Sequence, residues 1–150
     1  IPMRNSNSGF TLAELVVSIA LVGIVMSVAI PTYSNLTNDT QREINIANMS
    51  IIKDTFLRYY QEMHMSGNPH LPTEPENNLL DDEYRQFVLA DGRNVNHLFS
   101  GDLPKNTNNN AFHYEIFSDT SEQGYITKLF IISDVDESSP SYEEYRLGEI

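Results

Sequence analysis

The apolar run from Phe10 to Ile30 limits the possible folds of this chain more than any other feature, and Pro31 follows it directly. Its only ionisable side chain is Glu14. Because a helix rises about 1.5 Å per residue, a helix over this run covers roughly 30 Å, the thickness of the hydrocarbon layer of a bilayer. The run therefore predicts a helix that crosses a membrane once.

Glu14 is expected to have a partner, because a carboxylate inside a membrane segment costs about 2.5–3.5 kcal/mol on insertion scales. Glu14 follows Phe10 by one helical turn. A cut between Gly9 and Phe10 would create an ammonium group at the membrane depth of Glu14 in a neighbouring copy. We expect this ammonium to compensate the charge of Glu14.

The N-terminal residues resemble the class III signal peptide and prepilin-type methylation motif of type IV pilins and type II secretion pseudopilins. The resemblance rests on Gly9, Phe10, Glu14 and Pro31 at these spacings, after a short polar leader. It implies that a prepilin peptidase cuts between Gly9 and Phe10 and that Phe10 is then N-methylated. It further implies that Glu14 serves the assembly of subunits into a filament.

The same resemblance divides the chain into a leader of residues 1–9, a transmembrane and assembly helix of residues 10–30, and a globular domain of residues 31–150. It implies a pilin-like α+β fold, in which one long helix, first transmembrane and then amphipathic, packs on a small antiparallel sheet. Gly23 and Pro31 weaken the apolar helix, so a kink is expected there. The resemblance implies that this stretch serves assembly, although transmembrane helices commonly tolerate both residues.

Between Pro31 and Met65 the sequence becomes amphipathic, with apolar residues at three- and four-residue spacing. This pattern predicts a helix that lays one face on a core. Thr40 and Glu43 match a capping box, which alone would favour a new helix start at this point. The resemblance favours one continuous helix from Phe10 to about Met65, and we expect that helix. The predicted core-facing residues are Ile44, Ala47, Ile51, Ile52, Phe56, Tyr59, Tyr60 and Met63.

Beyond the long helix, the sequence predicts one short helix and a small sheet. Acidic residues 81–83, followed by Tyr84, Phe87 and Val88, predict a short amphipathic helix with acid at its positive end. Aromatic and β-branched residues over 112–117 and 125–133 predict an antiparallel hairpin, with turn residues 119–124 between its strands. A weaker pattern over residues 142–147 indicates a third strand.

Composition excludes several function classes. The net charge is -12, which argues against a nucleic-acid partner, because nucleic acid calls for clustered lysine and arginine. The sequence has no cysteine, so it forms no disulfide and no cysteine-based metal site. It also has no nucleophile elbow, no phosphate-binding glycine loop and no zinc-protease motif. We therefore expect a structural protein and not an enzyme.

The stretch from Asp134 to Ser138 places oxygen-bearing side chains at its first, third and fifth positions, as a calcium loop does. It has Ser139 where a calcium loop of that kind has glycine, and Tyr145 where it has glutamate. This departure favours a solvated acidic loop, and no cofactor is required. Major pseudopilins carry a calcium site in a C-terminal loop, so the resemblance keeps Asp134 and Asp136 as calcium candidates.

We expect a structural subunit of a type IV pilus or pilus-like filament. Its expected partners are copies of itself, the prepilin peptidase and the inner-membrane assembly machinery. The precursor would cross the inner membrane once, with its C-terminal domain outside the cytoplasm, before entering a cell-surface or periplasm-spanning filament. Two alternatives remain: a major pseudopilin of a type II secretion system, and a membrane-anchored binding module that never polymerises. Glu14 favours a subunit of the filament body, because minor tip pseudopilins can lack this acid.

Overall fold

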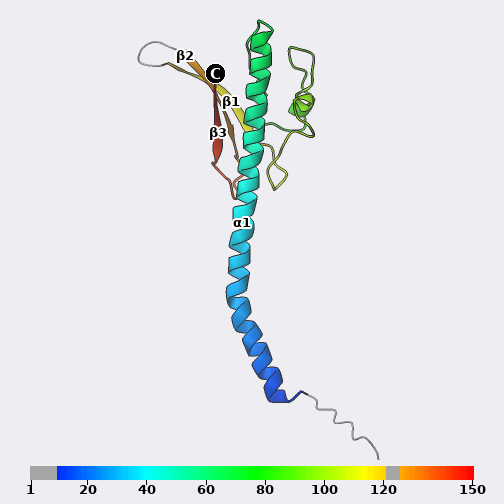
Figure 1. Cartoon of the computed structure of the whole chain (residues 1–150), viewed down its shortest axis with the longest axis vertical. Coiled ribbons are helices and arrows are strands. Elements are labelled where there is room, and N and C mark those ends of the chain that lie inside the picture. Colours follow the sequence, from blue (N-terminus) through cyan, green and yellow to red (C-terminus); the bar gives the residue numbers. More distant parts are fainter. Residues whose placement is uncertain (1–9, 121–125) are drawn as a thin grey trace, which may run out of the picture. The chain divides into compact units, whose positions relative to one another are not determined.

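The computed structural model describes residues 10–120 and 126–150 (Figure 1). The predicted leader, with Gly9, and the tip of the predicted hairpin lie outside the described residues. The chain consists of two units, Ile1–Asn38 and Asp39–Ile150.

One helix, α1, runs from Leu12 to Met65 without interruption and contributes to both units. Pro31 lies inside it. The prediction of one continuous helix is therefore confirmed. The capping-box pattern at Thr40 and Glu43 does not start a new helix, because the helical backbone continues on both sides of it.

In the second unit, α1 buries one narrow stripe of side chains. Ile44, Ala47 and Ile51, which were predicted to face the core, are exposed, and that part of the prediction is wrong. Each helical residue is turned by about 100° from its neighbour, so burial of Asn45 and Ile52 turns Ile44 and Ile51 toward solvent. The buried stripe consists of Asn45, Met49, Ile52, Thr55, Phe56 and Tyr59.

The sheet of the second unit has three antiparallel strands in the order β1-β2-β3. They are β1 (His113–Thr120), β2 (Ile126–Ser133) and β3 (Tyr145–Glu149). His113 and Tyr145 both lie opposite Ser133, which fixes the register of the central strand with its two neighbours. The predicted hairpin and the predicted third strand are confirmed, although the third strand begins later than expected.

Aromatic rings join α1 to the sheet. Phe56 of α1 meets Tyr114 of β1 edge-on, with ring centroids 4.8 Å apart, and Phe130 of β2 lies 6.3 Å from Phe56 and 6.0 Å from Tyr114. All three side chains are fully buried, and the Tyr114 hydroxyl donates to the Pro72 carbonyl at 2.8 Å. Edge-to-face aromatic contacts stabilise by about 0.5–1.5 kcal/mol beyond the burial of their area. The protein therefore has the expected pilin-like α+β fold, in which a long helix packs on an antiparallel sheet.

The prediction of a short amphipathic helix after residue 81 is wrong. In its place lies a 3-10 turn, η1 (Tyr84–Gln86), and a second 3-10 turn, η2 (Val95–Leu98), follows. Phe87 is extended, and its carbonyl accepts the N–H of Val95 at 3.0 Å. The backbone beyond η1 thus pairs with the following segment, which leaves it unable to continue a helix.

Candidate assembly site

Thr11 and Glu14 cap the start of α1 by binding each other. The hydroxyl of Thr11 accepts the N–H of Glu14 at 3.2 Å. In return, Glu14 Oε2 accepts the N–H of Thr11 at 2.9 Å and its hydroxyl at 2.8 Å. This reciprocal pair is a capping box, which satisfies backbone donors that a helix start otherwise leaves unpaired. The sequence Thr11-Leu12-Ala13-Glu14 carries the signal of this capping box, although Glu14 was expected only as an assembly residue.

The helix that follows Glu14 presents apolar side chains outward on all sides. Every described side chain between Phe10 and Ile30 is exposed. By length and composition, α1 is the one helix among the described residues that could cross a membrane. Such a helix needs either lipid or other apolar helices around it.

Polar side chains in this segment bind the helix's own backbone. The Ser18 hydroxyl donates to the Glu14 carbonyl at 2.7 Å, and the Thr32 hydroxyl donates to the Val28 carbonyl at 3.0 Å. These bonds leave no hydroxyl donor of Ser18 or Thr32 to be satisfied by water, which suits an apolar environment. A side chain at Gly23 would meet nothing within 4 Å. The proposed assembly role of Gly23 and Pro31, and the expected kink, stay predictions.

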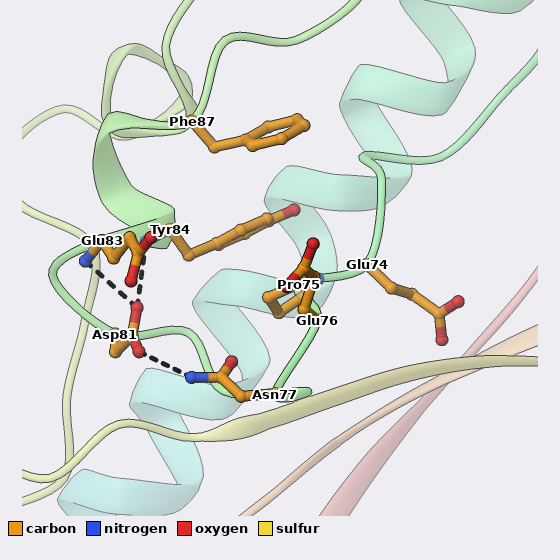
Figure 2. Close-up of a pocket in the computed structure, with 8 residues that line it drawn as sticks. All are labelled: Glu74, Pro75, Glu76, Asn77, Asp81, Glu83, Tyr84 and Phe87. Atoms are coloured by element: carbon orange, nitrogen blue, oxygen red, sulfur yellow. Dashed lines mark hydrogen bonds between the residues drawn. The ribbon is translucent and has the colours of Figure 1, made fainter.

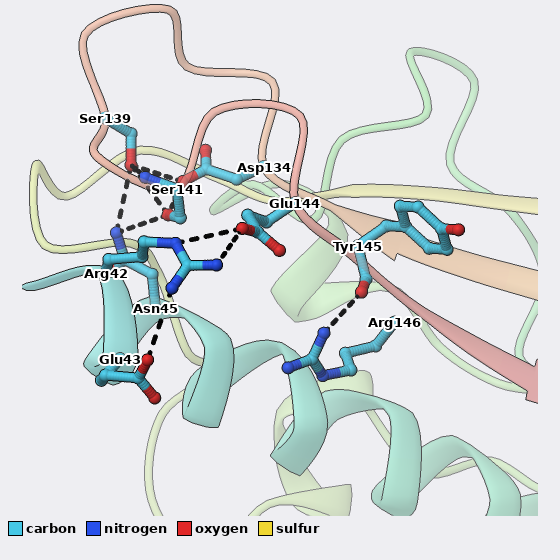
Figure 3. A network of polar contacts seen from close by, with 9 residues as sticks. All are labelled: Arg42, Glu43, Asn45, Asp134, Ser139, Ser141, Glu144, Tyr145 and Arg146. Carbon is cyan, nitrogen blue, oxygen red and sulfur yellow. Dashed lines mark hydrogen bonds and ion pairs between the residues drawn. The ribbon is translucent and has the colours of Figure 1, made fainter. Parts of the chain in front are cut away.

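A buried side-chain amide on α1 forms hydrogen bonds with the C-terminal loop, residues 134–144 between β2 and β3 (Figure 3). Asn45 is fully buried, and its Nδ2 donates to the hydroxyls of Ser139 and Ser141 at 3.1 and 2.8 Å. Its Oδ1 accepts the N–H of Thr107 at 2.8 Å. One helix side chain thus holds two loops that lie far away in the sequence. A chain without cysteine needs such contacts to fix its C-terminal loop.

Asp134 is the first residue of this loop, and its carboxylate is held by hydrogen-bond donors. Its Oδ2 accepts the hydroxyls of Ser139 and Ser141 at 2.5 and 2.6 Å, and its Oδ1 accepts Asn106 Nδ2 at 3.2 Å. Asp134 is 1% exposed, so these bonds replace the water that the carboxylate loses on folding. These two hydroxyls and one amide therefore explain how the protein can bury this acid.

Asp136 receives a second set of donors from the loop of residues 106–110. Its Oδ2 accepts the amide groups of Asn106, Asn108 and Asn110 at 3.0, 2.9 and 2.8 Å. Hydrogen bonds from Ser138, Asn110 and Asn108 lower the pKa of Asp136 well below its usual range. Among the described residues, no group of three or more metal-binding side chains surrounds a common point. Calcium at Asp134 and Asp136 stays a prediction.

A separate pocket of about 460 Å³ lies beside η1 (Figure 2). Two aromatic rings form part of its wall, Tyr84 and Phe87, which stack with their centroids 5.7 Å apart and their planes 19° apart. Four of its other lining residues are acidic. This pocket was not predicted from the sequence, because it is formed by an irregular segment that has no periodic pattern. The lining residues are Glu74, Pro75, Glu76, Asn77, Asp81, Glu83, Tyr84 and Phe87.

An α+β fold with an exposed apolar N-terminal helix and one acid at its start defines a pilin-like class of protein. Residues 4–30 match the Prokaryotic N-terminal methylation motif, which lies across the predicted cleavage point and the apolar segment. No curated protein and no solved structure gives a significant match. The chain therefore carries the N-terminal methylation motif, or class III signal peptide, of the type IV pilin and pseudopilin family. Pilins and pseudopilins are structural proteins and not enzymes, and the motif implies processing by a prepilin peptidase.

Proposed function

We propose that the protein is a structural subunit of a type IV pilus or a pilus-like filament, and that it polymerises through the N-terminal part of α1. The observation that carries the proposal is the position of Glu14. It is the only ionisable side chain between Phe10 and Ile30, and it lies at the start of an apolar helix whose side chains are all exposed. The precursor resides in the inner membrane, where lipid surrounds the apolar part of α1. In the filament, the apolar helices of neighbouring subunits take the place of that lipid.

The hydrogen bonds of Glu14 leave room for the expected partner. Both bonds from Thr11 reach Oε2, and Oε1 accepts none from the described residues. After cleavage between Gly9 and Phe10, the Phe10 ammonium of a neighbouring subunit binds Oε1. An unpaired charge in a low-dielectric interior is strongly unfavourable, so a subunit in the wrong axial position is rejected.

The second unit offers additional surface for neighbouring subunits. Ile44 and Ile51 are 46% and 50% exposed, and Ala47 between them is also exposed. Their spacing places these three residues on one face of α1. Contact with other copies would remove this face from water at a gain of about 25 cal/mol per Å² of apolar area. This exposed stripe supports assembly by a surface that the single subunit leaves uncovered.

A type II secretion filament is the second candidate, because the same methylation motif occurs in its pseudopilins. Deleting the gene separates the two candidates. A pilus subunit predicts the loss of surface filaments with secretion unchanged, whereas a pseudopilin predicts the loss of secretion.

The direct test replaces Glu14 by alanine or glutamine and measures the filaments released by shearing. We expect each variant to reduce the sheared filaments by about tenfold or more, because the neighbour's ammonium loses its counter-charge in an apolar core. The amount of subunit in the membrane should not fall. The matched control is Glu43→Ala, which removes an exposed acid from the same helix. Unchanged filament yield from the Glu14 variants would favour a membrane-anchored module that never polymerises.

A further inference from the structure

Nearly every described basic side chain is already engaged within its own subunit. Arg42 binds Glu144, Arg85 binds Asp102, and the others reach acids, hydroxyls or carbonyls. Lys128 is the exception, since no ion pair or hydrogen bond of its side chain exists among the described residues. The engaged side chains are those of Arg42, Lys53, Arg58, Arg85, Arg93, Lys105 and Arg146.

Lys128 lies on β2 and is exposed. It lines an open hollow of about 530 Å³ at one end of the sheet, together with Tyr60, His70 and Ile150. In a chain with a net charge of -12, a surface lysine without a partner among the described residues is an uncommon group. It is therefore the natural cation for a contact with an acidic surface of another copy.

The pocket beside η1 contains the complementary groups. Asp81 and Glu74 are partly used within the subunit, because Asp81 accepts the N–H of Tyr84 and Glu74 accepts the N–H of Ile116. Glu76 and Glu83 also line the pocket, and their carboxylates have no ion pair or hydrogen bond within the described residues. Two acidic side chains of the pocket beside η1 are thus available to an external cation.

The aromatic wall makes this pocket different from a plain acidic surface. Phe87 is 41% exposed and stacks on the buried ring of Tyr84, so one aromatic ring of the pocket wall remains accessible (Figure 2). An ammonium group gains about 0.5–2 kcal/mol from an aromatic face, the larger value applying when it leaves water. A lysine, with its apolar stem and charged end, matches such a pocket better than a small inorganic cation does.

We propose that Lys128 of one subunit enters the pocket between Glu76, Glu83 and Phe87 of the next subunit. The inference rests on the proposed filament function and names a contact of its outer domain. The hollow around Lys128 and the pocket beside η1 share no lining residue, so the contact joins two different patches. Where each subunit gives its Lys128 to one neighbour and its pocket to another, the contact repeats from copy to copy in one direction and builds an open chain.

Charge reversal tests this contact in cells that assemble the full protein. Lys128→Glu and Glu76→Lys should each lower the yield of sheared filaments at least fivefold, and the double variant should restore most of the yield. Lys128→Glu combined with Glu137→Lys is the control, because Glu137 is an exposed acid outside the pocket. Normal yields from both single variants, or equal rescue by the control, would overturn the contact while the filament function stands. Absence of filaments from the unaltered protein would overturn both.

Cross-linking tests the geometry independently of charge. The sequence contains no cysteine, so a Lys128→Cys, Glu76→Cys double variant has only the two introduced thiols. A short bismaleimide should convert assembled filaments of this variant into a ladder of covalent multimers, and either single variant should give no ladder. Products that stop at the dimer, or an equal ladder from a Lys128→Cys, Glu137→Cys pair, would overturn the head-to-tail contact.

Discussion

Glu14 Oε2 accepts both the N–H and the hydroxyl of Thr11, at 2.9 and 2.8 Å, while the Thr11 hydroxyl accepts the N–H of Glu14 at 3.2 Å. Thr11 therefore holds one oxygen of the acid within the same subunit. The other oxygen, Oε1, accepts no hydrogen bond from residues 10–120 and 126–150, which leaves it open to a second partner. In the proposed membrane precursor, the same bonds would offset part of the cost of placing Glu14 in lipid.

Replacing Thr11 tests whether this cap orients Glu14. Thr11→Val removes the hydroxyl, and loss of an N-cap costs about 0.5–2 kcal/mol. We expect Thr11→Val to enter filaments several-fold less well than the unaltered protein when both are expressed in the same cells. Thr11→Ser keeps the hydroxyl and should enter almost normally. Equal incorporation of the valine and serine variants, measured by mass spectrometry of sheared filaments, would contradict this role.

The sheet depends on a close contact between Gly148 of β3 and the ring of Phe130 on β2. A Cβ at position 148 would lie 2.1 Å from Phe130 Cε1, closer than real contacts allow. Gly148→Ala should therefore lower the free energy of unfolding by about 1–3 kcal/mol, as overpacked cores do. Gly101→Ala is the matched control, because a Cβ there would meet nothing within 4 Å. Urea unfolding of the full chain in detergent, followed by tyrosine signals, gives both values, and equal effects would contradict the contact.

The buried amide of Asn45 should be needed to hold the C-terminal loop. Asn45→Ala leaves the N–H of Thr107 and the hydroxyls of Ser139 and Ser141 without this partner, at a cost of about 1–3 kcal/mol for buried polar groups. We expect faster proteolysis near Ser139 and a lower urea midpoint. Gln61→Ala, an exposed change on the same helix, should alter neither property. An unaffected loop in Asn45→Ala would count against the network.

The lowered pKa values of two carboxylates predict that the folded protein loses stability in acid. The backbone N–H of Tyr84 is the main cause that lowers the pKa of Asp81, and hydrogen bonds from Ser138, Asn110 and Asn108 lower that of Asp136. The unfolded chain, with aspartate pKa values near about 3.9, then takes up protons before the folded protein does. These contributions are fully present above about pH 5 and are lost as the pH falls through the unfolded and then the folded pKa values.

Urea midpoints between pH 7 and pH 3 measure this loss. We expect the midpoint to be nearly constant above about pH 5 and to fall below about pH 4. Asp136→Asn should be less stable at pH 7 and should show a smaller fall, because its side chain no longer titrates. An equal fall in both proteins would show that Asp136 does not contribute to the acid sensitivity.

The pattern Thr-x-x-Glu occurs once at the start of α1 and once inside it, and the two copies have different outcomes. Thr11-Leu12-Ala13-Glu14 forms a capping box, whereas the Thr40 and Glu43 pattern lies within a continuous helix. A capping box is local and becomes a helix start only where the preceding chain leaves the helix. The first pattern lies next to the cleavage motif, and the second lies where the helix simply continues. Local spacing alone therefore could not separate them.

Long-range contacts explain what else the sequence could not predict. The aromatic and β-branched runs were sufficient for the hairpin, since strand preference and turn residues are local signals. Ile52, Phe56 and Tyr59 were correctly predicted to face the core. Ile44, Ala47 and Ile51 were misplaced because the stripe begins at Asn45, which is buried through loops 62 to 96 positions away. The pocket beside η1 likewise joins residues that no spacing rule connects. The methylation motif was predictable because its residues are contiguous, and the cleavage and assembly roles of single residues in it stay predictions.

The most direct measurement is the mass of the subunit in filaments sheared from the native cell. The central claim is that Glu14 is compensated by a processed N-terminus, and it predicts a chain that begins at N-methylated Phe10. Filaments built from subunits that still carry the residues before Phe10 would contradict the claim, because no ammonium group would then exist at the depth of Glu14.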